Sequence, residues 1–332
     1  MPELRKDPLS DIWVVFAPER RLRPQYIGPV AEQDFIAPEN CPFCEGNEVM
    51  TPPEICADRN NHGGANQAGW TLRVVPNKFP ALRVEGHLEK QGEAFYDKIS
   101  GIGAHEVIIE TNSHTKGIDE LPTEAITAVF RTYKQRILDL KQDIRFRYIQ
   151  VFKNHGARAG ATIPHSHSQV VAMPVVPGRL RERLNHAKAH YTAKDRCIFC
   201  DILRYESENH KRILFETPGY IVMSPYSPRL PFELWIFPRN HSASFEDTGD
   251  ENLSDLAAVF KETLRKINKA LESPAYNLLL HNAPFHNNYR EYFHWHLELI
   301  PVTGGTGGFE VGTHTYINPT LPEEAINVLK KM

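Results

Sequence analysis

The chain has 332 residues, of which 41% are apolar and 24% are charged, which is enough hydrophobic sequence for two modest globular domains. Its formal net charge of −3 argues against a general affinity for nucleic acid. No apolar run approaches the roughly 20 residues of a membrane helix, and the first residues lack the apolar core of a signal peptide. These features predict a cytoplasmic protein.

The first half of the chain begins its pattern with a cysteine pair, Cys41 and Cys44. Segments 56–69 and 84–101 are rich in Gly, Asn and charge, and are predicted as long loops. Apolar periodicity and β-branched content then predict four regular elements, namely a strand over 105–111, a helix over 123–141, and paired strands over 147–153 and 169–176.

A polar stretch over 179–196, rich in Arg, His and Lys, is predicted as the boundary between the halves. A second cysteine pair follows it, at Cys197 and Cys200. The same pattern rules then predict a strand over 232–238, a helix starting at Ser254 and ending at 271, and paired strands over 276–281 and 295–301.

Five elements recur in the same order in both halves, which indicates an internal duplication. The spacing of the histidines agrees, with 51 residues from His114 to His165 and 53 from His241 to His294. Each half is predicted as a strand–helix–strand–strand unit on a mainly antiparallel sheet, an α+β fold. The expected domains are 1–180 and 190–332.

The duplication predicts two metal sites. Zinc in proteins is usually held by four Cys and His ligands, and two of them often come from a C-x-x-C turn. A redox dithiol is the alternative interpretation of such a pair, but a thioredoxin-like βα context is missing. Both zinc sites are expected to be structural because four protein ligands leave no position for a catalytic water. The predicted ligands are Cys41, Cys44, His114 and His165 in one site, and Cys197, Cys200, His241 and His294 in the other.

The segment from Asn154 to Gln169 carries the strongest prediction of catalysis. His165 and His167 are two residues apart, so on a strand they lie on one face, and a metal at His165 would fix the backbone beside His167. The preceding loop contains glycine, and its amides could hold phosphate. Imidazole is neutral at physiological pH and is a good nucleophile toward phosphorus. The alternative is that His167 is one more metal ligand or a core histidine.

The motif N-x-G-x-x-x-G-x-x-x-x-H-x-H-x-Q resembles that of the galactose-1-phosphate uridylyltransferase family, within the histidine-triad superfamily. The segments 13–24 and 74–82 are similar to the family's N-terminal strand with its arginine turn and to its nucleotide-contacting strand. The resemblance implies tandem histidine-triad-like domains, a role in galactose metabolism, and a homodimer. It also implies a ping-pong transfer of a nucleoside monophosphate from a nucleotide sugar.

Residue roles are carried over with this resemblance. It implies that His167 is the nucleophile and that Gln169 steadies the nucleotidylated histidine, whereas related hydrolases carry a third histidine there. The second half has no glycine loop, and Glu298 replaces the glutamine, so it is not expected to catalyse. The residues expected to contact the nucleotide, its phosphates and the sugar are Arg20, Arg23, Asn77, Asn154, Gly160, Thr162, Phe309 and Val311.

The acceptor end departs from the uridylyltransferase pattern. Ser166 and Ser168 stand where that motif has Pro and Gly, and Gly308, Thr313 and His314 stand where it has Lys, Tyr and Glu. These features are closer to the branch that contains ADP-glucose phosphorylase, which passes AMP from ADP-glucose to inorganic phosphate. The main expectation is a UDP-glucose:hexose-1-phosphate uridylyltransferase, and an ADP-sugar adenylyltransferase using phosphate is the alternative.

Two other classes of function remain open at this stage. Tandem Cys and His sites occur in zinc-containing nucleic-acid-binding modules, although the acidic balance disfavours one. A histidine-triad hydrolase of dinucleotides is disfavoured by Gln169. The basic cluster Arg179, Arg181 and Arg183 is interpreted as a solvated linker face.

Overall fold

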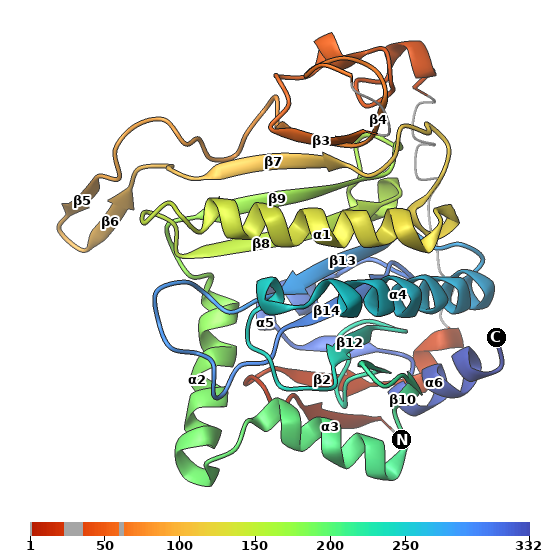
Figure 1. Cartoon of the computed structure of the whole chain (residues 1–332). Helices are drawn as coiled ribbons and strands as arrows, with labels where there is room; N and C mark the ends of the chain where they lie inside the picture. Colours follow the sequence, from red (N-terminus) through yellow and green to blue (C-terminus); the bar gives the residue numbers. More distant parts are fainter. Residues whose placement is uncertain (1, 23–35, 60–62) are drawn as a thin grey trace.

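The computed structural model describes residues 2–22, 36–59 and 63–332. Its largest element is a ten-stranded sheet in which every strand pair is antiparallel (Figure 1). The predicted α+β fold with mainly antiparallel sheets is therefore confirmed. In order across the sheet, the strands are β10 (Ile213–Glu216), β11 (Tyr220–Met223), β12 (Leu234–Pro238), β14 (His296–Pro301), β13 (Tyr276–His281), β8 (Tyr148–His155), β9 (His167–Met173), β7 (Ala104–Ile109), β4 (Trp70–Pro76) and β3 (Cys56–Arg59).

The predicted duplication is visible in the topology. The first unit runs β7, α1 (Thr123–Leu140), β8 and β9, and the second runs β12, α4 (Asp250–Leu271), β13 and β14. The two units join where β8 pairs with β13, and the strand order outward from this seam is the same on both sides. The units are thus related by an approximate twofold axis through the seam.

The helices α1 and α4 lie side by side on one face of the sheet (Figure 1). Each buries one stripe of apolar residues, as its helical periodicity predicts. Phe130 and Phe260 hold equivalent positions in the two helices, and their rings meet edge to face at 5.5 Å. One core beneath both helices therefore spans the seam.

The opposite face is covered differently in the two halves. In the second half, α2 (Gly178–Lys194) and α3 (Ile198–Asn209) pack over the sheet. A small sheet adjoins them, with β2 (Trp13–Phe16) between β1 (Glu3–Lys6) and β15 (Tyr316–Asn318), near the last helix α6 (Pro322–Lys330). In the first half, the turn that carries Cys41 and Cys44 packs on Trp70, Val75 and Ile109.

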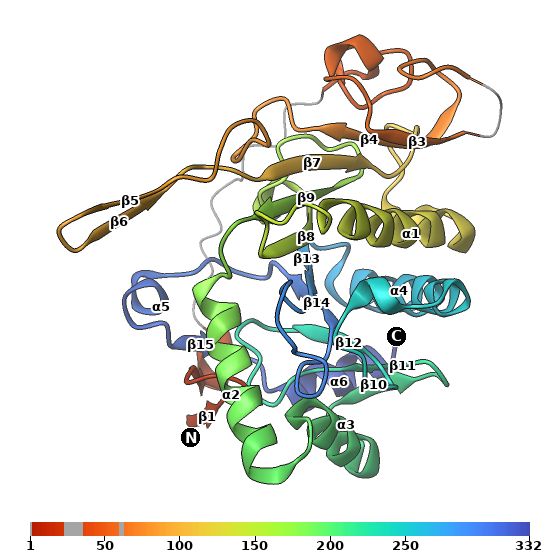
Figure 2. The same cartoon turned by 60° about the vertical axis from the view of Figure 1, so that its left-hand side comes forward.

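The stretch 179–196, predicted as the boundary between the halves, forms α2, because Leu180, Leu184 and Ala187 recur at helical spacing and are buried among many charges. Three local predictions are wrong. The loop predicted over 84–101 contains the hairpin of β5 (Lys90–Glu93) and β6 (Tyr96–Ile99), which projects from the body (Figures 1 and 2). The start of the loop predicted over 56–69 is β3, an edge strand. The helix expected to begin at Ser254 begins at Asp250.

Candidate active site and metal sites

Strand β9 presents two sets of side chains on its two faces. Ser168 and Val170 point toward α1, where Ser168 meets Tyr133. His167 and Gln169 therefore point away from α1, as the period of two along a strand requires. His165, just before the strand, and His167 are both buried, with 0% and 6% of the residue exposed.

The structure brings together the four residues predicted for the first metal site. Their ligand atoms lie within 4.8 Å of one another and could hold a metal ion. Nδ1 of His165 lies 3.7 Å from Sγ of Cys41, and its Nε2 donates to the carbonyl oxygen of Thr111 at 2.7 Å. That hydrogen bond leaves the Nδ1 lone pair facing the thiols. Burial lowers the pKa of His165 to about 4, which keeps the ring neutral.

The second predicted group is assembled in the same way and could also hold a metal ion. Nδ1 of His241 lies 3.2 Å from Sγ of Cys200, and Nδ1 of His294 lies 3.7 Å from it. Nε2 of His294 donates to the carbonyl oxygen of Pro238 at 3.0 Å, as His165 does in the first half. The rings of His165 and His294 therefore have the same orientation, with Nε2 on a backbone carbonyl oxygen and Nδ1 toward the thiols. Two thiols and two imidazoles in each group match the donor set that zinc prefers.

His167 does not belong to either group of metal-ligand atoms. Its Nδ1 lies 2.8 Å from the carbonyl oxygen of His165, to which it donates, and its ring contacts Phe43 with centroids 5.1 Å apart. Nε2 is therefore the ring atom that keeps a lone pair. Burial holds the pKa of His167 below its ordinary value, so the imidazole is neutral near pH 7.

Gln169 belongs to a chain of polar contacts across β9, β7 and the end of β4. Its Oε1 accepts from Nε2 of His105 at 2.8 Å, and Nδ1 of His105 accepts from the amide of Ala81 at 3.1 Å. The side chain of Asn77 lies 3.2 Å from the same His105 Nε2. Asn77 and Gln169, which are far apart in sequence, thus share one neighbour. His105 was missed by the sequence reasoning, although it begins the segment that carries His114.

The loop between β8 and β9 is fastened by the second half of the chain. Asn277 of β13 donates to Oδ1 of Asn154 at 2.8 Å and to the carbonyl oxygen of Ala159 at 2.9 Å. Gly156 and Gly160 have φ values of 81° and 90°, which other residues rarely adopt. Thr162 is exposed at the end of the loop. The glycines are therefore used for the backbone geometry of a tight turn, in which the amides of Ala159 and Gly160 donate to the carbonyl oxygens of Gly156 and Ala157.

Other predicted substrate contacts lie apart from this group. Arg20 lines a hollow of about 440 Å³ together with residues of the second half, among them Gly304 and Thr320. Phe309 and Val311 are 48% and 69% exposed on the short helix α5 (Gly308–Thr313), which packs beside β15. Figure 2 shows α5 at the side of the molecule, away from β9. Arg23 lies outside the described residues.

The counterpart of the catalytic histidine in the second half is enclosed. His296 has 0% exposure, and its ring is stacked against Phe237 and His281, both with centroids 4.6 Å away. Glu298, at the position of Gln169, accepts from Arg229 and His281. Aromatic rings and paired charges therefore surround the His296 ring. This arrangement agrees with the expectation that the second half does not catalyse.

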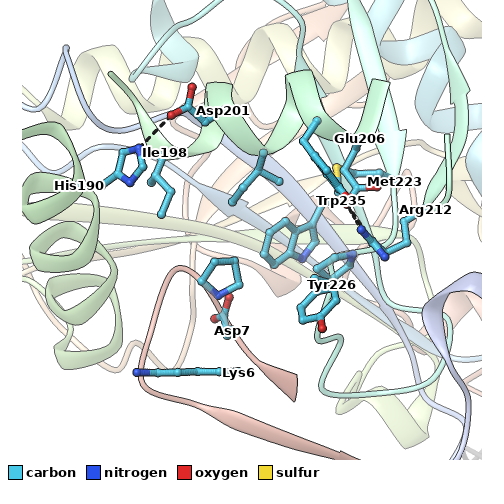
Figure 3. Close-up of a pocket in the computed structure, with 14 residues that line it drawn as sticks. Lys6, Asp7, His190, Ile198, Asp201, Glu206, Arg212, Met223, Tyr226 and Trp235 are labelled. Carbon is cyan, nitrogen blue, oxygen red and sulfur yellow. Dashed lines mark hydrogen bonds and ion pairs between the residues drawn. The ribbon is translucent and has the colours of Figure 1, made fainter. Parts of the chain in front are cut away.

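Figure 3 shows an apolar hollow of about 410 Å³ between α3 and the turn after β1. Trp235 and Tyr226 line it, and the ion pair of Arg212 with Glu206 lies at one side. Its lining includes none of the predicted catalytic or substrate-binding residues. This hollow is therefore not the predicted nucleotide site.

The side of β9 that faces α1 holds polar residues that the sequence reasoning did not single out for a role. Lys153 and Glu110 form an ion pair at 2.6 Å, with 1% and 0% of their side chains exposed. Ser166 and Ser168 bond to the same carboxylate. Burial acts to raise the pKa of Glu110, but the charge of Lys153 and these hydrogen bonds hold it below its ordinary value. The sequence did contain a signal for this pair. Glu110 directly follows the apolar residues at the end of β7, and Lys153 lies in β8, where a buried strand would not be expected to carry a charge.

The fold and the H-x-H segment define a class of protein, an α+β protein of two similar strand–helix–strand–strand units in which one unit presents a buried histidine on β9. The family models for the N-terminal and C-terminal domains of galactose-1-phosphate uridyl transferase match residues 1–177 and 183–323. The chain therefore belongs to the galactose-1-phosphate uridyl transferase family and is an enzyme of that nucleotidyltransferase type.

Named relatives cover the whole chain. It is 35% identical to the ADP-glucose phosphorylase of Arabidopsis thaliana, over 100% of this chain and 93% of the relative. It is 28% identical to the galactose-1-phosphate uridylyltransferase of Thermotoga maritima, over 100% and 98%. A crystal structure of an Arabidopsis thaliana ADP-glucose phosphorylase with bound ADP-glucose matches with a TM-score of 0.84 at 35% identity, over 100% of this chain and 99% of that one.

A search for membrane-crossing segments among the described residues found no helix with the length and apolar character to span a bilayer.

Proposed function

We propose that the enzyme transfers a nucleoside monophosphate from a nucleotide sugar to a phosphate-bearing acceptor through a covalent bond to His167. The donor is a UDP-hexose and the acceptor is a hexose-1-phosphate, as in the uridylyltransferases. The observation that carries the proposal is the hydrogen bond from Nδ1 of His167 to the carbonyl oxygen of His165 at 2.8 Å. It fixes the ring and leaves Nε2 as the nucleophile.

The chemistry consists of two displacements at one phosphorus atom. The Nε2 lone pair of His167 attacks the α-phosphorus, the bond to the bridging oxygen breaks, and the sugar leaves as its 1-phosphate. A phosphate oxygen of the acceptor then attacks the same phosphorus, the N–P bond breaks, and His167 is released. The Nδ1 proton stays on the ring throughout, so neither step requires a separate general base at His167.

Residues around the loop would hold the transferring group. The amides of Ala159 and Gly160 already donate to carbonyl oxygens within the loop. We assign the side chain of Asn154 and the remaining amides of the loop to the phosphate oxygens, because preorganised donors stabilise the charge that develops there. Thr162 lies exposed beside them. We assign Gln169 to the nucleotidylated histidine, held in place by its bond to His105 at 2.8 Å.

We propose that both Cys and His groups bind zinc and that both sites are structural. The donor set favours zinc, and all four ligands of each site come from the protein. At the first site the ion would fix His165, and with it the carbonyl oxygen that orients His167. Zinc would thus support the geometry without entering either displacement.

A second candidate function is transfer of AMP from an ADP-sugar to inorganic phosphate. The 35% identity to the Arabidopsis thaliana ADP-glucose phosphorylase over the whole chain supports it, while the two uridyl transferase family models and the 28% identity to the uridylyltransferase of Thermotoga maritima support the first. Both candidates use the same nucleophile and differ in the base of the donor and in the acceptor.

Labelling with the donor's α-phosphate tests the proposal. UDP-glucose or ADP-glucose carrying ³²P at the α-phosphate is expected to give an acid-labile label on the wild-type protein and none on His167→Ala. The matched control is His296→Asn, which changes the counterpart histidine and should still be labelled. If neither nucleotide labels the wild type, or if His167→Ala is labelled like the wild type, the covalent mechanism is wrong.

The labelled enzyme also separates the two candidates. Discharge of a UMP label by galactose-1-phosphate supports the uridylyltransferase. Discharge of an AMP label by inorganic phosphate supports the phosphorylase instead.

We further propose that the enzyme is a homodimer. Arg20, Phe309 and Val311 are expected to contact substrate by family resemblance, yet in one chain they lie with the second half, away from β9. A second copy could bring them to His167. The exposure of Phe309 and Val311 supports such a contact.

A further inference from the structure

The helix-facing side of β9 contains a buried ionic network directly behind the nucleophile. Nζ of Lys153 lies 2.6 Å from Oε2 of Glu110, 3.0 Å from Oγ of Ser166 and 3.1 Å from the carbonyl oxygen of His167 itself. The ammonium group thus uses its three donors on the carboxylate, on a neighbour of His167, and on the backbone of His167.

The two neighbours of His167 in the chain are tied to the same carboxylate. Ser166 donates to Oε2 of Glu110 at 2.6 Å, and Ser168 donates to Oε1. The hydroxyl of Tyr133 on α1 meets Ser168 as well. Every backbone unit from residue 166 to 168 is therefore linked to one fixed pair of charges.

The second half provides an internal comparison. His165 and His294 are equivalent, so Ser166 and Ser168 correspond to Trp295 and Leu297. Phe152 pairs with Gln169, which sets Lys153 opposite Ser168, and in the second half Leu280 pairs with Leu297. The counterparts Leu280, Trp295 and Leu297 are all buried and apolar.

The comparison of the two halves shows which of these side chains the fold requires. The same sheet, helix and metal-ligand geometry forms in the second half with apolar side chains at these positions. Burying an ion pair is costly, and an apolar replacement of similar volume is often equally stable. The charged network is therefore not what the fold requires, and it occurs in the half that carries the glycine loop and Gln169.

We propose that Lys153, Glu110, Ser166 and Ser168 form a brace, a set of positioning residues that holds the backbone of His167 in line with the phosphorus of the donor. This inference rests on the proposed nucleotidyl transfer through His167. The brace lies on the opposite face of the strand from the His167 ring, so it contacts neither substrate nor the reacting atoms. It acts on the orientation of Nε2, to which in-line displacement is sensitive.

The test removes the hydroxyls that connect the strand to the carboxylate. The double variant Ser166→Ala with Ser168→Ala leaves the Lys153–Glu110 pair intact. We expect the rate of label transfer to His167 to fall by about tenfold to a hundredfold, as small misplacements of reacting groups do. The KM for the donor should be unchanged, because the brace does not bind it. Hydrogen exchange at residues 165–173 should become faster.

A near-isosteric pair isolates the hydroxyl. Ser168→Thr keeps the bond to Glu110, whereas Ser168→Val has the same branched shape without it. We expect the Thr variant to retain more of the wild-type rate than the Val variant. The control in the second half is Leu297→Ala, which should lower thermal stability while leaving the labelling rate unchanged well below its unfolding temperature.

The outcomes are distinguishable. Equal labelling rates in the wild type and the double serine variant would overturn the brace, as would an equal slowing by Leu297→Ala. If the wild type takes no label, the proposed function fails, and the brace fails with it as a device for transfer. If the wild type is labelled and the double variant is slowed, unchanged exchange at residues 165–173 would overturn the brace, and local acceleration would support it.

Discussion

At the scale of single residues, the loop before the nucleophile depends on backbone geometry that only glycine supplies easily. Gly156 has a φ of 81°, and a Cβ added to it would lie 2.9 Å from Cβ of Ala275. Both the strained dihedral angle and the close contact oppose a side chain. The loop cannot shift freely to relieve them, because Asn277 holds Ala159 at its far end.

We therefore predict that Gly156→Ala destabilises the protein by about 1–3 kcal/mol and lowers kcat/KM, since the displaced loop directly follows Asn154 at the end of β8. Denaturant unfolding and steady-state kinetics measure the two effects. Gly178→Ala is the matched control, because Gly178 begins α2 with open space around it and no positive φ. It should change stability by no more than about 1 kcal/mol. An unchanged kcat/KM in Gly156→Ala would contradict the role given to the loop.

For single residues, the sequence predicted contacts between near neighbours in the chain and groups that recur in both halves. The i, i+2 spacing placed His165 and His167 together, and the repeat supplied both groups of four Cys and His residues that could hold a metal ion. It did not reveal the pairing of Lys153 with Glu110 or of Gln169 with His105. Those contacts join residues 43 and 64 positions apart, and they exist only once the strand register is known.

At the scale of elements, periodicity located the six strands of the two repeats and the two long helices, because each buries one clear face. It failed for α2, whose buried stripe is narrow and surrounded by Arg, Lys and His. It also failed for the hairpin of β5 and β6, which is almost fully exposed and therefore carries no hydrophobic pattern. Elements that bury little surface have a weak hydrophobic pattern and are therefore hard to predict from a sequence.

The short helix α5 yields a prediction at this scale. If a second copy brings α5 to the active site, one subunit with His167→Ala and another with Val311→Asp would share one intact site. Mixing the two inactive variants under exchange conditions should restore up to about a quarter of wild-type activity, which is the statistical share of intact sites. Light scattering should give the mass of two chains, and no recovery from an exchanging dimer would contradict the shared site.

At the scale of the whole molecule, the two copies form one sheet and carry two similar Cys and His groups, whereas the positive-φ glycine loop and the contact of Gln169 with His105 belong to the first copy. The proposed division into 1–180 and 190–332 falls within α2, the connection between the two copies. The first copy keeps an open polar group around Gln169 and His105, whereas the second encloses His296 among Phe237, Trp235 and His281. We therefore expect the two Cys and His groups to differ in their effect on catalysis.

Removal of each metal separately tests this division. Cys44→Ser and Cys200→Ser should each lose one of two bound zinc ions, measured by elemental analysis of the purified proteins. We expect both to lose about 2–5 kcal/mol of stability, the range for losing a covalent cross-link, seen as a lower unfolding temperature.

The effect of the two variants on catalysis should differ. Cys44 shares its group with His165, whose carbonyl oxygen orients His167, whereas Cys200 shares its group with His294 beside the enclosed His296. Below both unfolding temperatures, Cys44→Ser should lose most of the labelling rate and Cys200→Ser should keep it. Equal losses would show that the two sites act together on one cooperative structure, and full labelling of Cys44→Ser would separate the first metal from the orientation of His167.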